Sequence, residues 1–289
     1  MHRICVYGTV FNNASTVEDS VKSVFDPSYD IVIVDSYSRD GTWEKLQKLK
    51  KEFNLTLLRL KSTRGRGRAY ALEHCPDSST TAYFDLDVRY NENFHKVLKS
   101  GLKELLVFGP ILTYVQTKEE ILRFGNWPDL NFGEDIEFLS RQQISLTFPL
   151  IIGQNEEVEV KNLFIEREKR YSKFWKIRIM KNIIDLYRAL NINYKDLVSI
   201  YPYTKGYVIL LIVLDLISRS LGKYRNANEN NLLHFYRKAL STMDDPRKYI
   251  DDVDEKYMTV SLSRAIYNYL KYNNIVDDDL VRKHLITIE

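Results

Sequence analysis

Hydrophobic and polar positions follow two different periods along the first half of the chain. Short apolar runs without polar interruption, such as residues 31–34, are typical of strands buried on both faces of a sheet. Between them, apolar residues recur every three or four positions, as at Val21, Val24 and Phe25, which indicates amphipathic helices. This pattern predicts strands at residues 4–7, 31–34, 55–60, 82–84, 105–108, 111–115 and 146–152. It predicts helices at residues 15–25, 40–53, 66–74, 93–102, 118–124 and 134–141.

Alternation of strands with helices indicates βαβ units, so we expect an α/β fold with a mostly parallel, doubly wound sheet. Ligands of such sheets bind beyond the carboxyl ends of the strands. The character of the chain changes after residue 152, where a linker-like stretch, 153–160, leads into the basic segment 161–190. We expect only helices from there to Glu289. The sequence thus predicts an α/β domain over residues 1–155 and a helical extension over 156–289.

Composition narrows the class of protein only modestly. With 44% hydrophobic residues the chain is not of a disordered type, and a net charge of +3 does not point to nucleic acid. Cys5 and Cys75 are too few for a disulfide framework, which favours a reducing compartment. The chain starts without a signal-peptide pattern, and its longest apolar run, 207–214, is too short to cross a bilayer. We therefore expect an intracellular protein that is soluble or attached to a surface.

Acidic residues come at or just after predicted strands or at the start of a helix. Asp35 ends one strand, Asp85 and Asp87 follow another, and Asp135 opens the helix 134–141 together with Glu134. Two carboxylates two positions apart can both lean toward a divalent cation, and Mg²⁺ and Mn²⁺ prefer oxygen ligands that include substrate phosphates. A solvated strand end is the alternative for the first pair, and a helix-dipole role is the alternative for Asp135.

A basic, glycine-rich stretch lies between these acidic sites. It reads Arg64-Gly65-Arg66-Gly67-Arg68 and also follows a predicted strand. Guanidinium groups and accessible backbone N–H groups are suited to phosphate. Together with the carboxylates, this stretch indicates a site for a metal ion and a diphosphate.

The order of these motifs resembles the family 2 glycosyltransferases, which are inverting enzymes of the GT-A fold that use sugar nucleotides. The resemblance covers about residues 3–152. It rests on five motifs in order: Val6-Tyr7-Gly8-Thr9-Val10-Phe11-Asn12-Asn13, Val34-Asp35 through Asp40-Gly41-Thr42, Arg64-Gly65-Arg66-Gly67-Arg68-Ala69, the "DxD" Asp85-Leu86-Asp87, and Gly133-Glu134-Asp135.

The resemblance implies a role for each motif. Donor-binding residues would be Thr9, Asp35 (at the base), Arg64, Arg66, Arg68 and Asp85 (at the ribose or a metal-bound water). Asp87 would ligate Mg²⁺ or Mn²⁺ directly, with Asp85 beside it. Asp135 would be the general base that takes the proton of the acceptor hydroxyl.

The implied reaction moves a sugar, of hexosyl type, from a nucleoside-diphosphate sugar to a hydroxyl of a glycan, a lipid-linked sugar or a protein. A non-catalytic module that binds sugar nucleotides or a membrane surface is the alternative function. Trp127 and Glu134 are candidates for contact with the acceptor, and packing is the alternative for Trp127. We expect no nucleic-acid partner and a cytoplasmic location, with attachment to the inner membrane face left open.

Two segments of the helical extension carry the question of membrane contact. Residues 171–190 place Phe174, Ile177, Met180, Ile184 and Tyr187 at helical spacing among basic residues. Such a helix either lies on an anionic membrane or packs on the α/β domain with a solvated basic face. The run 207–217 is either a buried core helix or a membrane-dipping element.

Overall fold

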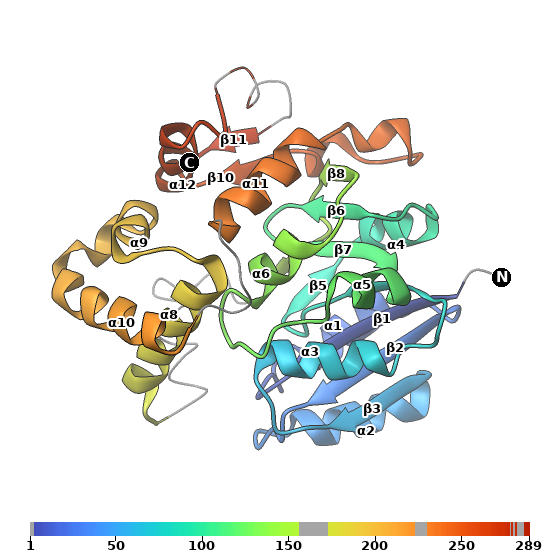
Figure 1. Ribbon diagram of the computed structural model, residues 1–289. Coiled ribbons are helices and arrows are strands. Elements are labelled where there is room, and N and C mark those ends of the chain that lie inside the picture. Colours follow the sequence, from blue (N-terminus) through green and yellow to red (C-terminus); the bar gives the residue numbers. More distant parts are fainter. Residues whose placement is uncertain (1–2, 156–172, 223–229, 278, 280, 282–285) are drawn as a thin grey trace.

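The computed structural model describes residues 3–155, 173–222, 230–277, 279, 281 and 286–289 (Figure 1). Its centre is a seven-stranded sheet in the order β3-β2-β1-β4-β7-β6-β8. The strands are β1 (Ile4–Val10), β2 (Tyr29–Asp35), β3 (Leu55–Arg59), β4 (Thr80–Tyr83), β6 (Leu105–Phe108), β7 (Thr113–Thr117) and β8 (Leu146–Pro149). β7 runs antiparallel to both of its neighbours, and the other pairs are parallel. The predicted α/β fold with a mostly parallel sheet, the GT-A arrangement, is confirmed.

Helices cover both faces of this sheet because successive strand residues point to opposite sides. Val6, Ile31 and Ile33 pack with α1 (Val17–Val24), α2 (Thr42–Glu52) and α4 (Glu92–Lys99). Tyr7 and Val34 pack instead with α3 (Arg64–Glu73), α5 (Lys118–Phe124) and α6 (Glu134–Arg141). Both faces of the central strands are therefore buried, which explains why their sequences show no polar alternation.

The two cysteines correct one expectation. Cys5 on β1 and Cys75, two residues beyond the end of α3, form a disulfide within the core, and 70 positions separate them in the sequence. The pairing ties the end of α3 to the central strand. The expectation of a reducing compartment was based on the assumption that the two cysteines form no disulfide, and the structure does not support that assumption.

Two short strand pairs lie outside the main sheet. β5 (Val88–Tyr90) pairs antiparallel with β9 (Gly153–Asn155), so the start of the linker-like stretch is part of the fold. β10 (Val260–Leu262) and β11 (Ile286–Ile288) pair in parallel near the end of the chain. The expectation that the chain after residue 160 holds only helices is wrong. The strands β10 and β11 have three residues each, which is too few for alternation of apolar and polar residues to be recognised among the helical patterns around them.

The helical region forms two groups beside the sheet (Figure 1). One holds α8 (Trp175–Leu190), α9 (Tyr194–Ile200), the 3₁₀ helix η1 (Pro202–Tyr207) and α10 (Val208–Ser220). The other holds α11 (Asn231–Ser241), the 3₁₀ helices η2 (Pro246–Lys248) and η3 (Glu255–Tyr257), and α12 (Arg264–Tyr272). α11 packs on α6 and β8, and one hydrophobic cluster runs from the sheet into both groups. The domain boundary at residue 155 stays a prediction.

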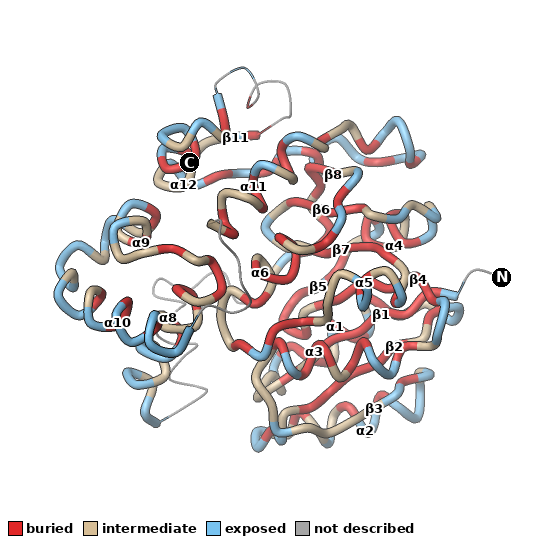
Figure 2. Tube along the Cα trace, viewed as in Figure 1, coloured by how far each residue is buried: buried red, intermediate tan, exposed pale blue. Residues whose placement is uncertain are grey.

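Burial along α8 and α10 separates the alternatives left open by the sequence (Figure 2). In α8, Tyr187 is buried and Ile184 partly buried against the core, whereas Phe174, just before the helix, and Ile177 are exposed. Residues 171–172 of this segment lie outside the described residues. α10 is not a buried core helix, since most of its apolar side chains face solvent. Within the described part of the chain, no helix is both long and apolar enough to cross a membrane.

Candidate active site

A cavity of about 270 Å³ lies at the carboxyl ends of the central parallel strands. Its lining comes from the end of β1 and the loop after it, from the loops after β2, β3 and β4, and from the first residue of α3, with one residue from the loop before α6 and one from α8. These residues are Thr9, Val10, Phe11, Asn13, Ser36, Lys61, Ser62, Thr63, Arg64, Asp85, Leu86, Asp87, Asn131 and Arg178. The predicted site residues Thr9, Arg64, Asp85 and Asp87 are thus brought together.

The two carboxylates of the DxD motif stand on the strand-end side of this cavity. Asp85 is partly exposed and forms an ion pair with Arg68, while its backbone N–H donates to Tyr90 Oη at 2.9 Å. Asp87 lines the same cavity and is only 9% exposed. Burial, with a contribution from the charge of Asp85, raises the pKa of Tyr90, so this phenol stays neutral and accepts the hydrogen bond. The pair is held by the short turn between β4 and β5.

The basic stretch belongs to a helix that begins two residues earlier than predicted. α3 begins at Arg64, and its cap Thr63 accepts a hydrogen bond from the Arg66 backbone N–H at 3.1 Å. Side chains two positions apart on a helix point in nearly opposite directions, because each residue turns by about 100°. Arg64 and Arg68 therefore share one side, and Arg66 is exposed and does not line the cavity. The positive end of α3 and Arg64 both face the cavity, which suits an anion.

Arg68 is buried in the interior beneath the cavity. Its guanidinium donates to Glu134 Oε1 at 3.0 Å and to Asp85, and it stacks on Trp127 at 4.7 Å and Tyr83 at 5.0 Å from the ring centroids. Burial alone lowers the pKa of Arg68, but the carboxylates of Asp85 and Glu134 outweigh it and the net pKa is raised. Arg68 is thus a support for the DxD motif, not a group on the cavity wall.

The glycines of this stretch allow α3 to pack closely. A Cβ on Gly65 would lie 1.9 Å from the carbonyl oxygen of Pro128, and one on Gly67 would lie 2.3 Å from Thr9 Oγ1. Any larger residue would push α3 away from the first strand and from the loop before α6. The two glycines are therefore needed for packing, and their backbone does not form a phosphate-binding loop.

Asp35 differs from what the resemblance implies. Its carboxylate is 0% exposed, accepts from Arg59 Nε at 2.9 Å and from the Ser38 backbone N–H at 3.1 Å, and does not line the cavity. Ser36 lines the cavity instead. In this structure the side chain of Asp35 organises the turn after β2, and contact with a base would need another arrangement of Arg59.

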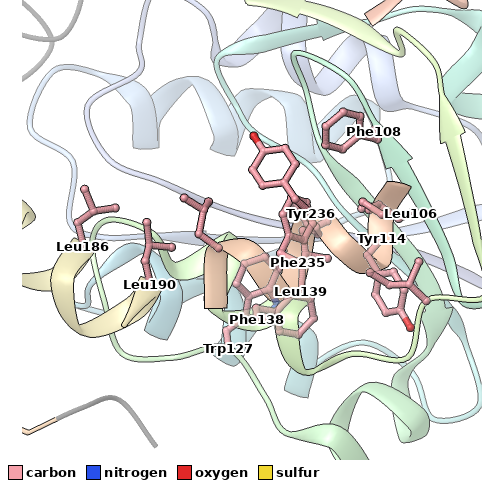
Figure 3. Close-up of a cluster of buried hydrophobic side chains, with 14 of the residues drawn as sticks. Leu106, Phe108, Tyr114, Trp127, Phe138, Leu139, Leu186, Leu190, Phe235 and Tyr236 are labelled. Carbon is pink, nitrogen blue, oxygen red and sulfur yellow. The ribbon is translucent and has the colours of Figure 1, made fainter. Parts of the chain in front are cut away.

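Trp127 and Glu134, the two candidates for the acceptor side, both lie in the interior. Trp127 is 4% exposed, stacks on Phe138 at 4.0 Å and donates from Nε1 to Tyr7 Oη at 2.9 Å. Figure 3 shows it within the cluster that joins α6 to the C-terminal helices. Glu134 is held by Arg68 and by Arg64 at 3.4 Å, and burial raises its pKa. Packing, the alternative for Trp127, is what the structure shows.

Asp135 lies at the junction of the sheet domain and the helical region. It follows Glu134 at the start of α6 but does not line the cavity. Burial raises the pKa of Tyr201 and Tyr236, and the negative charge of Asp135 adds to the shift in both. Its charge also acts on Arg68, the partner of Asp85. Asp135 is therefore electrostatically connected both to the DxD motif and to tyrosines of the C-terminal helices.

Arg178 and Lys61 are cavity residues that sequence reasoning missed. Arg178 comes from α8, and its position in the site was hidden because the basic segment was assigned to solvent or membrane. Lys61 lies three positions before Arg64, the first residue of the predicted motif. Proximity to Arg64-Gly65-Arg66 was the available signal for Lys61, whereas no local pattern marks Arg178.

The residues around the DxD motif fit a divalent cation. Among the described residues no cluster of three or more His, Cys, Asp or Glu side chains could hold a metal ion. An open site of two carboxylates in a cavity is nonetheless the type that Mg²⁺ uses when substrate phosphates and water supply the remaining ligands. Asp87 and Asp85 would be the protein ligands there.

The sheet topology and this cavity define an α/β domain whose strand ends carry a cavity lined by carboxylates and cationic side chains. Residues 5–134 match the sequence model of the family described as glycosyl transferase family 2. The α/β part of this chain is thus similar to family 2 glycosyltransferase domains over these residues. None of the curated proteins matches the sequence.

Solved structures of glycosyltransferases resemble the chain at low identity. S. aureus TarS matches with 13% identity and a TM-score of 0.44, covering 75% of this chain and 54% of that one, so the chain spans about half of its length. The mannosyltransferase PcManGT from Pyrobaculum calidifontis, in complex with GDP-Man and Mn²⁺, matches with 14% identity and a TM-score of 0.45. That match covers 98% of this chain and 83% of the other.

Proposed function

We propose that the protein transfers a hexosyl group from a nucleoside-diphosphate sugar to an acceptor hydroxyl with inversion, assisted by Mg²⁺ or Mn²⁺. The observation that carries the proposal is one cavity, lined mostly by residues that match the family 2 model, that contains both the DxD carboxylates and cationic side chains in its lining. The acceptor class stays a glycan, a lipid-linked sugar or a protein. A cytoplasmic location also stays a prediction, with attachment to the inner membrane face left open.

The charges of the cavity suit a diphosphate. Arg64, Lys61 and Arg178 supply positive charge, and the N-terminal end of α3 adds the helix dipole. A divalent cation at Asp87 and Asp85 would neutralise charge that develops on the departing nucleoside diphosphate. Thr9 and Ser36 line the part of the cavity nearest β1 and β2, where the nucleoside would lie.

Asp135 is the proposed general base. An alcohol hydroxyl is far too weak an acid to lose its proton unaided near neutral pH, and a positioned carboxylate contributes about 10²–10⁴-fold to the rate. In-line attack with inversion needs the base and the leaving group on opposite sides of the sugar. Support for this assignment is that Asp135 belongs to a different element from the DxD motif and lies toward the C-terminal helices.

The test compares two variants with a matched control. Asp135→Asn keeps the size of the side chain and an oxygen for the Ile136 N–H, so binding of UDP or GDP with Mn²⁺ should be unchanged. Transfer to a panel of acceptors, or slow hydrolysis of the sugar nucleotide, should fall about 10²–10⁴-fold. Asp87→Ala should lose the Mn²⁺-dependent part of nucleotide binding, measured by calorimetry or thermal shift.

The control is Asp19→Asn, another acidic residue in the first turn of a helix but exposed and outside the cavity. It should behave as the wild type in both assays. Full transfer activity of Asp135→Asn would overturn the base assignment. Nucleotide binding by the wild type without transfer or hydrolysis on any acceptor would favour the non-catalytic binding module.

A further inference from the structure

Helix α10 distributes its side chains in the opposite way to an ordinary surface helix. Six apolar residues point outward and form what we call the outer face of α10: Tyr207, Ile209, Leu210, Val213, Leu216 and Ile217. Ile209 is 82% exposed and Leu216 61% exposed. The polar residues Asp215 and Ser218 are buried on the inner side. A helix whose outer side contacts only water usually buries its apolar residues and exposes its polar ones.

The inward position of Asp215 is stabilised by specific hydrogen bonds. Its carboxylate accepts from Arg219 Nε at 2.9 Å and from the Tyr194 backbone N–H at 3.4 Å, and the Tyr187 hydroxyl donates to the Leu211 carbonyl at 3.3 Å. The rotation of α10 about its axis is thus fixed by α8 and α9. Its exposed apolar side is a consequence of the packing, and contiguous apolar surface of this kind marks an interaction site.

The exposed charges of the group of helices that contains α10 are cationic. Among the described residues 173–222, the exposed ionic side chains are Lys173, Lys176, Lys181, Lys195, Lys205 and Arg219. The three acidic residues there, Asp185, Asp196 and Asp215, each accept hydrogen bonds within the fold. Lys205 borders the same shallow hollow as Tyr207, Ile209 and Val213. An apolar strip with a cationic border matches an anionic lipid surface.

We propose that the outer face of α10 lies flat on an anionic lipid bilayer. Its apolar side chains enter the boundary between headgroups and acyl chains, and the lysines contact the anionic headgroups. Tyr203, 78% exposed in η1, and Tyr207 supply the aromatic rings favoured at that depth. With 13 residues α10 is too short to span the bilayer.

Charge argues against a second copy of the chain as the occupant of this face. Two copies that paired α10 with α10 would bring the cationic borders together, with like charges facing one another. A bilayer with anionic headgroups instead lowers the energy of every exposed lysine in the group. The proposal does not depend on the chemistry of the active site.

The experiment measures co-sedimentation of the full chain with two kinds of vesicle, phosphatidylcholine alone and phosphatidylcholine mixed with phosphatidylglycerol. We expect binding to the mixed vesicles that is weaker on phosphatidylcholine and decreases with salt. The affinity of the double variant Ile209→Asp/Leu216→Asp for the mixed vesicles should be lower than that of the wild type by about tenfold or more. Leu122→Asp, an exposed leucine on α5, is the matched control and should bind as the wild type.

Circular dichroism and thermal unfolding of each variant are the controls for correct folding. Lys205→Glu, which leaves the apolar residues intact, provides a second test and should reduce binding to the mixed vesicles about fivefold. Equal binding by the wild type and the double variant, or no binding to either vesicle, would overturn the proposal. A dimer of the wild type that light scattering shows to dissociate in the double variant would overturn it in favour of a second copy.

Discussion

Helices α3 and α10 both depart from the usual pattern of apolar residues inside and polar residues outside, but in different ways. α3 buries Arg68 among aromatic rings and carboxylates, whereas α10 exposes leucine, isoleucine and valine and buries Asp215. In both helices the unusual residues are held by named partners. Each departure from simple amphipathic patterning coincides with a surface that we assign to binding, the ligand cavity beside α3 and the outer face of α10.

Removing Arg68 should have the largest effect on stability. Arg68→Met keeps much of the volume but leaves Glu134 buried without its closest cation, and loss of one partner from a buried ion pair costs about 3–5 kcal/mol. Urea unfolding would measure the loss. A change below about 1 kcal/mol would show that α3 does not depend on this pair.

The same variant should respond to pH. Burial already raises the pKa of Glu134, and loss of Arg68 should raise it further. The folded state then binds a proton more readily than the unfolded state, so stability is greatest at acidic pH and falls as pH rises through the folded pKa. The deficit relative to wild type should therefore be smaller near pH 5 than near pH 8, and a deficit independent of pH would contradict the role of Glu134.

The disulfide that ties the end of α3 to β1 should come next. Closing a loop of 70 residues stabilises a folded protein by about 4 kcal/mol in the chain-entropy estimate, with about 2–4 kcal/mol typical. The Cys5→Ala/Cys75→Ala variant should unfold at correspondingly lower urea concentration. Titration of thiols in denaturant without reductant is the control, and two free thiols in the wild type would rule the bond out.

Removal of the Arg178 side chain should have the smallest of these effects. We expect it to change ligand binding and not the stability of the fold. It is the residue by which the group containing α10 contributes to the cavity beside α3. Arg178→Ala should weaken binding of UDP or GDP about tenfold, the value of one charge-assisted contact to phosphate, with little change in thermal unfolding. The neighbouring Lys176→Ala, exposed and outside the cavity, is the matched control.

The comparison also shows which inferences the sequence supported. The motif order led to the family resemblance, which implied Thr9, and the positions after predicted strands led to Asp85, Asp87 and Arg64. All four residues line one cavity. The three arginines of the basic stretch were treated alike, but helical geometry sends Arg66 to solvent and Arg68 into the interior. Residues two apart on a helix point in nearly opposite directions, and the helix predicted at 66–74 already placed Arg66 and Arg68 in that relation.

The sequence by itself determined the strands of the main sheet, the α/β class and the position of the acidic residues at strand ends, because these depend on local periodicity and on the geometry common to parallel sheets. Only the tertiary structure decided the pairing of Cys5 with Cys75, the burial of Asp35 and Trp127, the entry of Arg178 into the cavity and the rotation of α10. Each of these depends on contacts between segments tens of residues apart, and no local pattern encodes which partner a side chain meets.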